Sequence, residues 1–224
     1  MEAQQYYDDL YMGGECPFHR HPGSYEHFVC LLGDPPPEAR CLDIGCGNGL
    51  ALRCAAEAGL DTYGLDLSTA ALEHSREASP ESSLLAADAV ALPFAEGAFD
   101  CVISLGVLEH TGDVPRALSE VGRVLRPGGR AVLVLPNSRF ALGLYPGTGQ
   151  REAVREQRHT LGEWVRLLRE SGLELVSVGK DLQRFWPPGK QRFLPRLTAR
   201  LARGLLAAWP LRYTYQFVFV VTHP

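Results

Sequence analysis

The part of the chain best suited to hold a ligand is a glycine-rich stretch between an apolar segment at 40–44 and a helical pattern from Leu50. It consists of Gly45, Cys46, Gly47, Asn48 and Gly49. Glycines permit a sharp turn and close approach to the backbone, and a helix start offers unpaired amides to an anion. The G-x-G-x-G spacing departs from the G-x-G-x-x-G dinucleotide fingerprint, which favours a compact amino-acid carboxylate over a pyrophosphate. A tight turn without a ligand is the alternative that the loop alone leaves open.

Three aspartates lie at or near the ends of short apolar segments. Asp66 follows 62–65, where a carboxylate can accept hydrogen bonds from both hydroxyls of a ribose. Asp88 comes soon after 84–86 and could accept a hydrogen bond from the exocyclic amine of adenine. Asp43 could attract an ammonium group directly or through water. Helix capping or surface solvation would explain any one of them, but the three together form a binding pattern.

Two histidines are candidates for proton transfer, because the ordinary pKa of imidazole lies near working pH. His110 stands just beyond the apolar segment 100–105 and is the first choice for a base that accepts a proton from a hydroxyl. A histidine that only orders its loop is the alternative. His159 is the second choice. It precedes Thr160, a predicted helix cap, and a simple surface position explains it equally well.

These residues require a scaffold that brings strand ends together. Strands are expected at 40–44, 62–65, 84–86, 100–105, 130–135, 173–178 and 215–222, and helices from Leu50, from a Ser68 cap, at 114–125 and at 161–171. Right-handed strand-helix-strand crossovers force a doubly wound, mainly parallel α/β sheet of seven strands. Ligands of such sheets bind at the carboxyl ends of the strands. The patternless stretch 138–159 is a candidate lid.

The order LDIGCGNG, YGLDLS, ADAVALPF, FDCVISLGVLEH and LRPGGRAVLVLPN resembles class I S-adenosylmethionine-dependent methyltransferases of the ubiquinone and menaquinone biosynthesis type, over about residues 38–178. The resemblance implies a seven-stranded sheet with one reversed strand near the C-terminus. It implies S-adenosylmethionine as cofactor and S-adenosylhomocysteine as product. The methionine part would bind at 45–49, the ribose at Asp66, and the adenine at Leu67, Asp88 and Ala89, while Leu105 and Gly106 would close the pocket.

The segment after the fourth strand bears on the acceptor. It lacks both the N-P-P-Y-like tetrad of amino-directed DNA and protein-glutamine methyltransferases and the Pro-Cys pair of cytosine-carbon enzymes. Related quinone O-methyltransferases and RNA-end enzymes bind a metal with an additional Glu, but that position is Gly106 here. No metal is therefore expected, although Glu109 and His110 are suitable by ligand type. The resemblance also puts a histidine at the position of His159 near the substrate cavity.

These features predict methyl transfer to a small-molecule acceptor, lipophilic or sugar-like, with oxygen slightly favoured as the accepting atom. A macromolecular methyltransferase acting on RNA or protein is one alternative. A cofactor-binding scaffold without activity is another. The acceptor itself is left open, because such pockets are built from variable segments.

The chain is expected to form one domain over 1–224. A lid segment at 1–37, with Tyr6, Tyr7 and Tyr11, precedes a cofactor-binding core at 38–179, and a basic insertion at 180–213 precedes the last strand at 214–224. Aromatic residues at such spacing more often form a packed amphipathic helix, which is the alternative to a lid. The insertion carries eight Lys or Arg and one Asp, although the whole chain has a net charge of −4. A helix from Pro195 with Arg196, Arg200 and Arg203 on one face predicts peripheral membrane contact through 190–212; the alternative is that its leucines cover the protein's own cavity.

Composition excludes several other classes. The 224 residues are 46% hydrophobic and 21% charged, which is ordinary for a globular domain. The six cysteines have no C-x-x-C spacing, and the start of the chain resembles neither a signal peptide nor a membrane span, so a cytoplasmic location is expected. Apart from the insertion the chain is acidic, which disfavours a nucleic-acid partner. The oligomeric state is left open.

Overall fold

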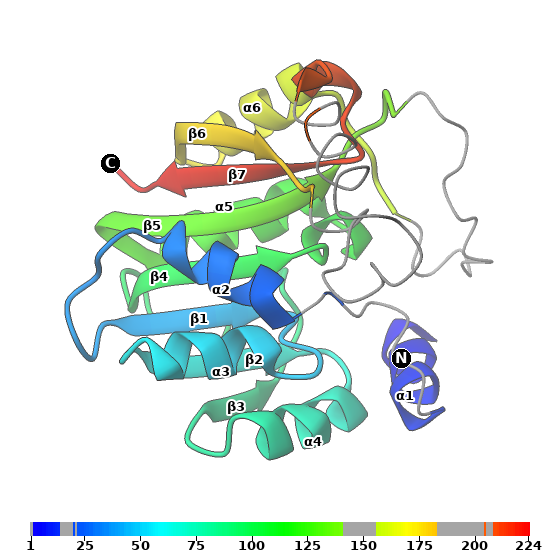
Figure 1. The fold of residues 1–224 in the computed structure, drawn as a ribbon. Coiled ribbons are helices and arrows are strands. Elements are labelled where there is room, and N and C mark those ends of the chain that lie inside the picture. Colours follow the sequence, from blue (N-terminus) through cyan, green and yellow to red (C-terminus); the bar gives the residue numbers. More distant parts are fainter. Residues whose placement is uncertain (1, 14–19, 21, 141–155, 183–203, 205–207) are drawn as a thin grey trace.

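The computed structural model describes residues 2–13, 20, 22–140, 156–182, 204 and 208–224. Seven strands form one sheet in the order β3-β2-β1-β4-β5-β7-β6 (Figure 1). They are β1 (Arg40–Ile44), β2 (Asp61–Asp66), β3 (Ser83–Ala86), β4 (Phe99–Leu105), β5 (Leu125–Pro136), β6 (Glu174–Lys180) and β7 (Gln216–Thr222). Strand β7 is antiparallel to both β5 and β6, and the other pairs are parallel. The predicted doubly wound sheet with one reversed C-terminal strand is confirmed.

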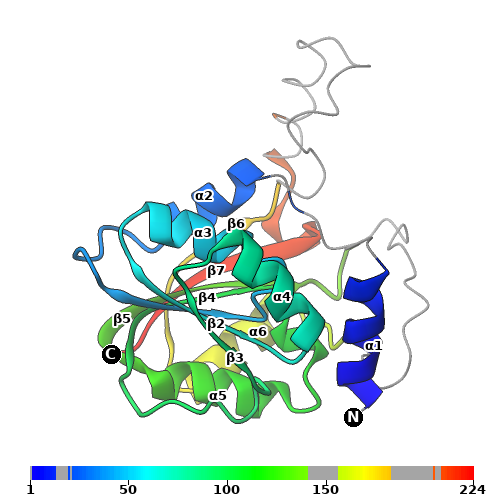
Figure 2. The same ribbon diagram turned by 90° about the horizontal axis from the view of Figure 1, so that it is seen from below.

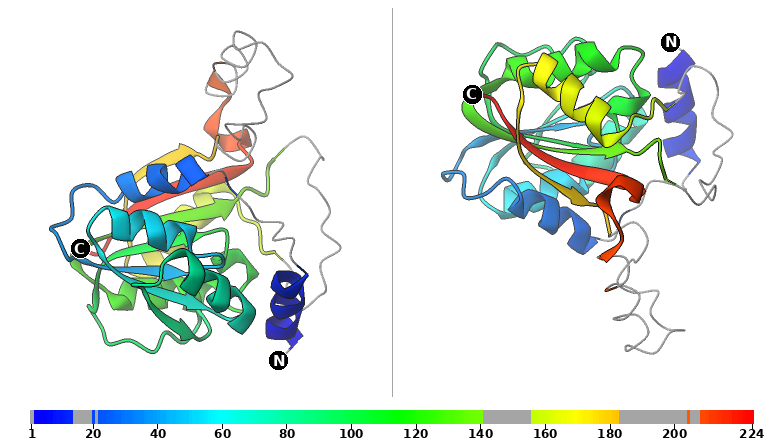
Figure 3. Two further views of the ribbon diagram at one scale, coloured as in Figure 1. Left: turned by 60° about the horizontal axis from the view of Figure 1, so that its bottom comes forward. Right: turned by 90° about the horizontal axis from the view of Figure 1, so that it is seen from above.

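Helices cover both faces of this sheet (Figure 2). Helices α2 (Pro22–Cys30), α3 (Leu50–Glu57) and α4 (Thr69–Ala78) lie on one face, and α5 (Val114–Val124) and α6 (Leu161–Glu170) lie on the other. Helix α1 (Glu2–Met12) stands apart from both layers, beside the carboxyl ends of the parallel strands (Figure 3). Two short 3₁₀ turns, η1 (Leu108–His110) and η4 (Leu211–Tyr213), complete the described elements.

Two apolar layers make up the core. One lies between the sheet and α5 and α6, where Val114, Leu118 and Val121 follow helical spacing and are fully buried. The other lies between the sheet and α2 and α3, and it includes the fully buried Phe28. Part of the segment 1–37 therefore belongs to the core, whereas α1 contributes no buried residue.

Local sequence signals explain the starts of α4 and α6. The Ser68 hydroxyl accepts a hydrogen bond from the Ala71 amide at 3.1 Å, as its cap position predicted. Thr160 begins α6 with a capping box, in which its hydroxyl and amide exchange hydrogen bonds with Glu163. Such caps satisfy amides that a helix start leaves without a partner in the helix itself.

The expected start of the strand that follows the helix at 114–125 is wrong by several residues. Strand β5 begins at Leu125, not at Arg130, because Leu125 already pairs with Phe99 of β4. A register shift between Phe99 and Cys101 absorbs the extra residues, and Gly128 has a φ of 76°. Gly128, which the sequence suggested as the end of a helix, therefore lies inside an irregular part of β5.

Several predicted features lie outside the described residues. They are most of the loop at 138–159 and the greater part of the basic insertion, including its predicted helix from 195. Within the ranges that the structure describes, no helix is both long and apolar enough to cross a bilayer.

Candidate functional site

The glycine loop curls over the carboxyl ends of β1 and β2. The amides of Gly45 and Cys46 both donate to the Leu65 carbonyl, at 2.7 and 3.0 Å. Gly45 has a φ of 73°, and a Cβ there would lie 2.4 Å from the Val107 side chain. Gly49 has a φ of 72°, and a Cβ there would lie 2.7 Å from the backbone of Ser75. Both positions require glycine, because their conformation is left-handed and their surroundings leave no room for a side chain.

Asp66 is held against this loop by backbone amides. Its Oδ2 accepts from the Gly47 amide and its Oδ1 from the Ser68 amide, each at 2.9 Å. Burial raises the pKa of the Asp66 carboxyl, and the two amide contacts oppose that rise. Each carboxylate oxygen has a further lone pair, so the side chain can accept from two more donors.

Asp43 lies on β1 behind the loop and is 3% exposed. Burial raises the pKa of its carboxyl to about 8, and the nearby Asp66 carboxylate adds to this rise. A cation brought beside Asp43 would favour the ionised form of the carboxyl.

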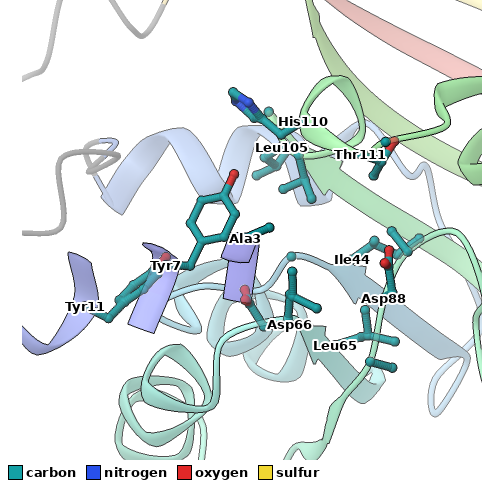
Figure 4. A pocket seen from close by; sticks show the side chains of 17 residues that line it. Ala3, Tyr7, Tyr11, Ile44, Leu65, Asp66, Asp88, Leu105, His110 and Thr111 are labelled. Carbon is teal, nitrogen blue, oxygen red and sulfur yellow. The ribbon is translucent and has the colours of Figure 1, made fainter. Parts of the chain in front are cut away.

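A cavity of about 190 Å³ opens at the carboxyl ends of β1, β2 and β4 (Figure 4). The sequence-predicted residues on its wall are Gly45, Asp66, Leu67, Asp88, Ala89, Leu105, Gly106 and His110. The view in Figure 4 places Asp66 and Asp88 toward one side, whereas the Tyr7 hydroxyl points toward the side where His110 lies. Polar acceptors and the candidate base thus share one cavity.

A smaller cavity of about 60 Å³ adjoins the first, since Tyr11, Gly45 and Leu105 line both. Its other sequence-predicted wall residues are Asp43, Cys46, Gly47 and Asn48. Of the predicted cofactor residues, Gly49 lines neither cavity; it is the residue before α3 and contacts Ser75. The other predicted cofactor residues line one or both of these two cavities.

Comparison with known proteins agrees with this arrangement. Residues 42–133 match the family described as Methyltransferase domain. This part of the chain is therefore similar to methyltransferase domains. That segment includes β2 to β4 and most of β1 and β5, and with them the glycine loop and the three aspartates.

Relatives and solved structures extend the likeness beyond the methyltransferase domain match. A demethylmenaquinone methyltransferase from Renibacterium salmoninarum is 41% identical over 98 residues, which cover 43% of this chain and 41% of that protein. A 27-O-demethylrifamycin SV methyltransferase from Amycolatopsis mediterranei is 32% identical over 178 residues, covering 69% and 62% of the two chains. The solved structure of an S-adenosylmethionine-dependent methyltransferase from Mesorhizobium loti matches with a TM-score of 0.65 at 23% identity, covering 89% and 96%.

The chain therefore has the fold of S-adenosylmethionine-dependent methyltransferases, and the resemblance that the motifs predicted is confirmed. The chain spans less than two thirds of the length of these two curated relatives.

Helix α1 closes one side of the main cavity. Ala3, Tyr7 and Tyr11 line the main cavity, and the role of these tyrosines as part of a lid stays a prediction. Asp8 fastens the helix to α4, because its Oδ1 accepts from the Ser68 hydroxyl at 2.6 Å and from the Ala70 amide at 3.2 Å. Burial, and next the charge of Glu109, raises the pKa of the Tyr7 hydroxyl above its usual range, so Tyr7 remains a neutral donor.

The two histidines have different surroundings. His110 ends η1 and lines the main cavity next to Thr111. The ring of His159 packs edge-on against Trp164, with 4.6 Å between ring centroids, and its backbone pairs with Asn137 beyond β5. His159 is not among the described residues that line either cavity. Its catalytic role stays a prediction.

Two residues of the site carry no signal in the sequence. Arg20 reaches the smaller cavity from the segment before α2, and Thr111 reaches the main cavity after η1. Neither belongs to a motif, because only the folded chain brings them to the strand ends. In the part of the chain that the structure describes, no group of three or more His, Cys, Asp or Glu side chains is arranged to hold a metal ion.

Proposed function

We propose that this protein is an S-adenosylmethionine-dependent methyltransferase whose acceptor is a small molecule, lipophilic or sugar-like, and whose accepting atom is oxygen. The observation that carries the proposal is a pair of adjoining cavities at the strand ends, lined by residues of the glycine loop and by Asp43, Asp66 and Asp88. The relatives named demethylmenaquinone and 27-O-demethylrifamycin SV methyltransferase, which by name act on small molecules, support the acceptor class.

The side chains that line the two cavities match the adenine, ribose and methionine parts of the cofactor. Asp66 offers acceptors for the two ribose hydroxyls, and Asp88 offers acceptors for the adenine amine beside Leu67 and Ala89. Leu105 and Gly106 lie between this end and the glycine loop, where the methionine part would bind. Asp43 supplies the negative charge for its ammonium group. When bound, the cofactor supplies a sulfonium methyl group that is already activated for transfer.

The charge of the main cavity favours a cationic donor and a neutral acceptor. Its described lining includes Asp66 and Asp88 and no Lys or Arg. Carboxylates in a partly enclosed cavity attract a sulfonium cation more strongly than they would in water. An anionic acceptor would meet repulsion from the same groups. A polyphosphate or nucleic-acid acceptor is therefore disfavoured, as is an acidic protein.

His110 is the group best placed to accept a proton from a hydroxyl acceptor. It lies at the cavity wall beside Thr111, across from Asp66 and Asp88 (Figure 4). A neutral imidazole binds the proton that the acceptor oxygen releases as the new bond to carbon forms. The protein's main task is then to hold the acceptor in line with the methyl group and to exclude water, which Tyr7 and Tyr11 of α1 assist.

Calorimetric titration tests this proposal. Wild type should bind S-adenosylhomocysteine at micromolar concentration and show no preference for NAD. The Asp66→Asn variant should lose about 1.5 to 3 kcal/mol of binding free energy, because charge-assisted hydrogen bonds to the ribose become neutral ones. Asp61→Asn is the matched control: Asp61 is an exposed carboxylate at the opposite end of the same strand. Binding of NAD alone, or equal losses in both variants, would contradict the proposal.

Activity on acceptors then separates the remaining alternatives. Methyl transfer from labelled S-adenosylmethionine to a lipid and small-metabolite extract, lost in His110→Ala with cofactor affinity retained, supports an oxygen acceptor and a base. Transfer to bulk RNA or protein fractions instead would favour the macromolecular alternative. Binding without transfer to any fraction would favour a scaffold.

A further inference from the structure

A buried arginine faces the glycine loop from outside the matched methyltransferase segment. Arg20 is 7% exposed and lines the smaller cavity together with Asp43 and the loop residues Gly45 to Asn48. A guanidinium is costly to remove from water, so a buried one requires partners or a ligand. Arg20 and Asp43 thus place a positive and a negative group on the wall of the same small cavity.

The partners of Arg20 come from two distant strands. Its NH1 group forms an ion pair with Asp181, which directly follows β6, and its NH2 group donates to the Gln216 Oε1 at 3.2 Å, at the start of β7. The side chain of Asp181 is fully buried. The Asp181 amide also donates to the Gln216 carbonyl at 3.2 Å, so the two partners are joined to each other. The guanidinium packs over the Phe28 ring, 5.2 Å from its centroid.

Asp181 and Gln216 orient the planar guanidinium of Arg20 but do not use all of its N–H donors. The two contacts engage two of the five N–H groups of the guanidinium fork. The backbones of both partners are hydrogen-bonded to each other at the sheet, so the plane of the guanidinium is set, and Arg20 lines the smaller cavity. An arginine in that geometry recognises a carboxylate through paired hydrogen bonds. The amino-acid end of the proposed cofactor carries one carboxylate and one ammonium group.

We propose that Arg20 binds the carboxylate of the cofactor, and that Asp181 and Gln216 are positioning residues that hold its guanidinium in place. This inference rests on the proposed function. In this proposal the two charged groups at the amino-acid end of the cofactor bind to different side chains: the ammonium group to Asp43 and the carboxylate to Arg20. The anionic end of the cofactor is then bound by a side chain from the segment before α2, in addition to the amides of the glycine loop.

A pair of ligands that differ by only this carboxylate tests the inference. The full chain is titrated with S-adenosylmethionine and with decarboxylated S-adenosylmethionine, which keeps the sulfonium and the ammonium. In Asp181→Asn, affinity for the first ligand should fall about tenfold, while affinity for the second changes less than about twofold. Arg20→Lys should reduce the preference for the carboxylate less than Arg20→Met, because it keeps the charge and loses the fork.

Removing one partner of a buried ion pair can unfold a protein, so a second variant replaces both. Arg20→Met with Asp181→Leu substitutes apolar groups for the pair, which is often tolerated. It should bind the two ligands with nearly equal affinity. Asp100→Asn, which removes an ion pair with Arg126 at the opposite end of the sheet, is the control and should keep the wild-type preference.

Equal losses for both ligands in Asp181→Asn would overturn the inference and show a merely structural pair. An unchanged preference in the double variant would overturn it as well. Failure of wild type to bind either ligand would instead refute the proposed function from which the inference starts.

Discussion

Asp43→Asn offers a test of the site that requires no ligand. The carboxyl of Asp43 is buried at the end of β1, and burial, with the charge of Asp66, raises its pKa to about 8. In the unfolded chain the same group has an ordinary pKa of about 3.9. Between these two values the folded protein therefore holds a proton that the unfolded chain has released.

The sign and size of the effect follow from this difference in proton binding. Stabilisation by the protonated carboxyl is fully present below the unfolded pKa and is lost as pH rises through the folded pKa. Across that window the free energy of unfolding falls by about 1.4 kcal/mol per pH unit for one proton. Asparagine does not titrate. Relative to Asp43→Asn, wild type should therefore lose about 2 kcal/mol of stability between about pH 6 and pH 8.

Urea unfolding of the ligand-free protein at a series of pH values measures this difference. The free energy extrapolated to water is compared for wild type, Asp43→Asn and the control Asp61→Asn, whose carboxylate is exposed. Parallel pH profiles for wild type and Asp43→Asn would refute the reasoning, since they would mean that Asp43 ionises alike in both states. The same variant should bind S-adenosylhomocysteine about tenfold more weakly, because the charge that faces the ammonium group is gone.

Two further predictions concern the loop and the lid. Gly45→Ala should abolish binding of S-adenosylhomocysteine in calorimetry, because the φ of Gly45 is 73° and the added Cβ would lie 2.4 Å from Val107. Gly59→Ala is the control, because Gly59 has a similar φ of 84° but open space around it. This control should lower the free energy of unfolding in urea by only about 1 to 2 kcal/mol and leave binding intact. Asp8→Ala removes the two hydrogen bonds that fasten α1 to α4, so stopped-flow measurements should show faster cofactor release with little change in the melting temperature. An unchanged release rate would mean that α1 does not hold the cofactor in place.

Much of the fold was predictable from local patterns. The glycine loop needs left-handed dihedrals, which glycine adopts freely. Ser68 caps α4 by accepting from the amide of Ala71, three residues later in the chain. Asp66 and Asp88 come at or soon after strand ends, which a parallel sheet gathers at one edge. The reversed strand β7 was expected from the family resemblance and not from the pattern itself. The start of β5 at Leu125 was missed, because its pairing with Phe99 is a contact between strands and leaves no periodic signal.

What the sequence by itself determined is the class of the protein: a doubly wound sheet, a glycine loop and acidic strand ends, all set by short stretches whose dihedrals and caps are local properties. Only the tertiary structure decided how the site is enclosed. Arg20 pairs with Asp181, which lies 161 residues later in the sequence. Helix α1 is held beside the main cavity by the contact of Asp8 with the start of α4. The pKa of Asp43 also depends on burial by elements far along the chain. Such contacts depend on which strand ends the topology brings together, and residue spacing does not encode that.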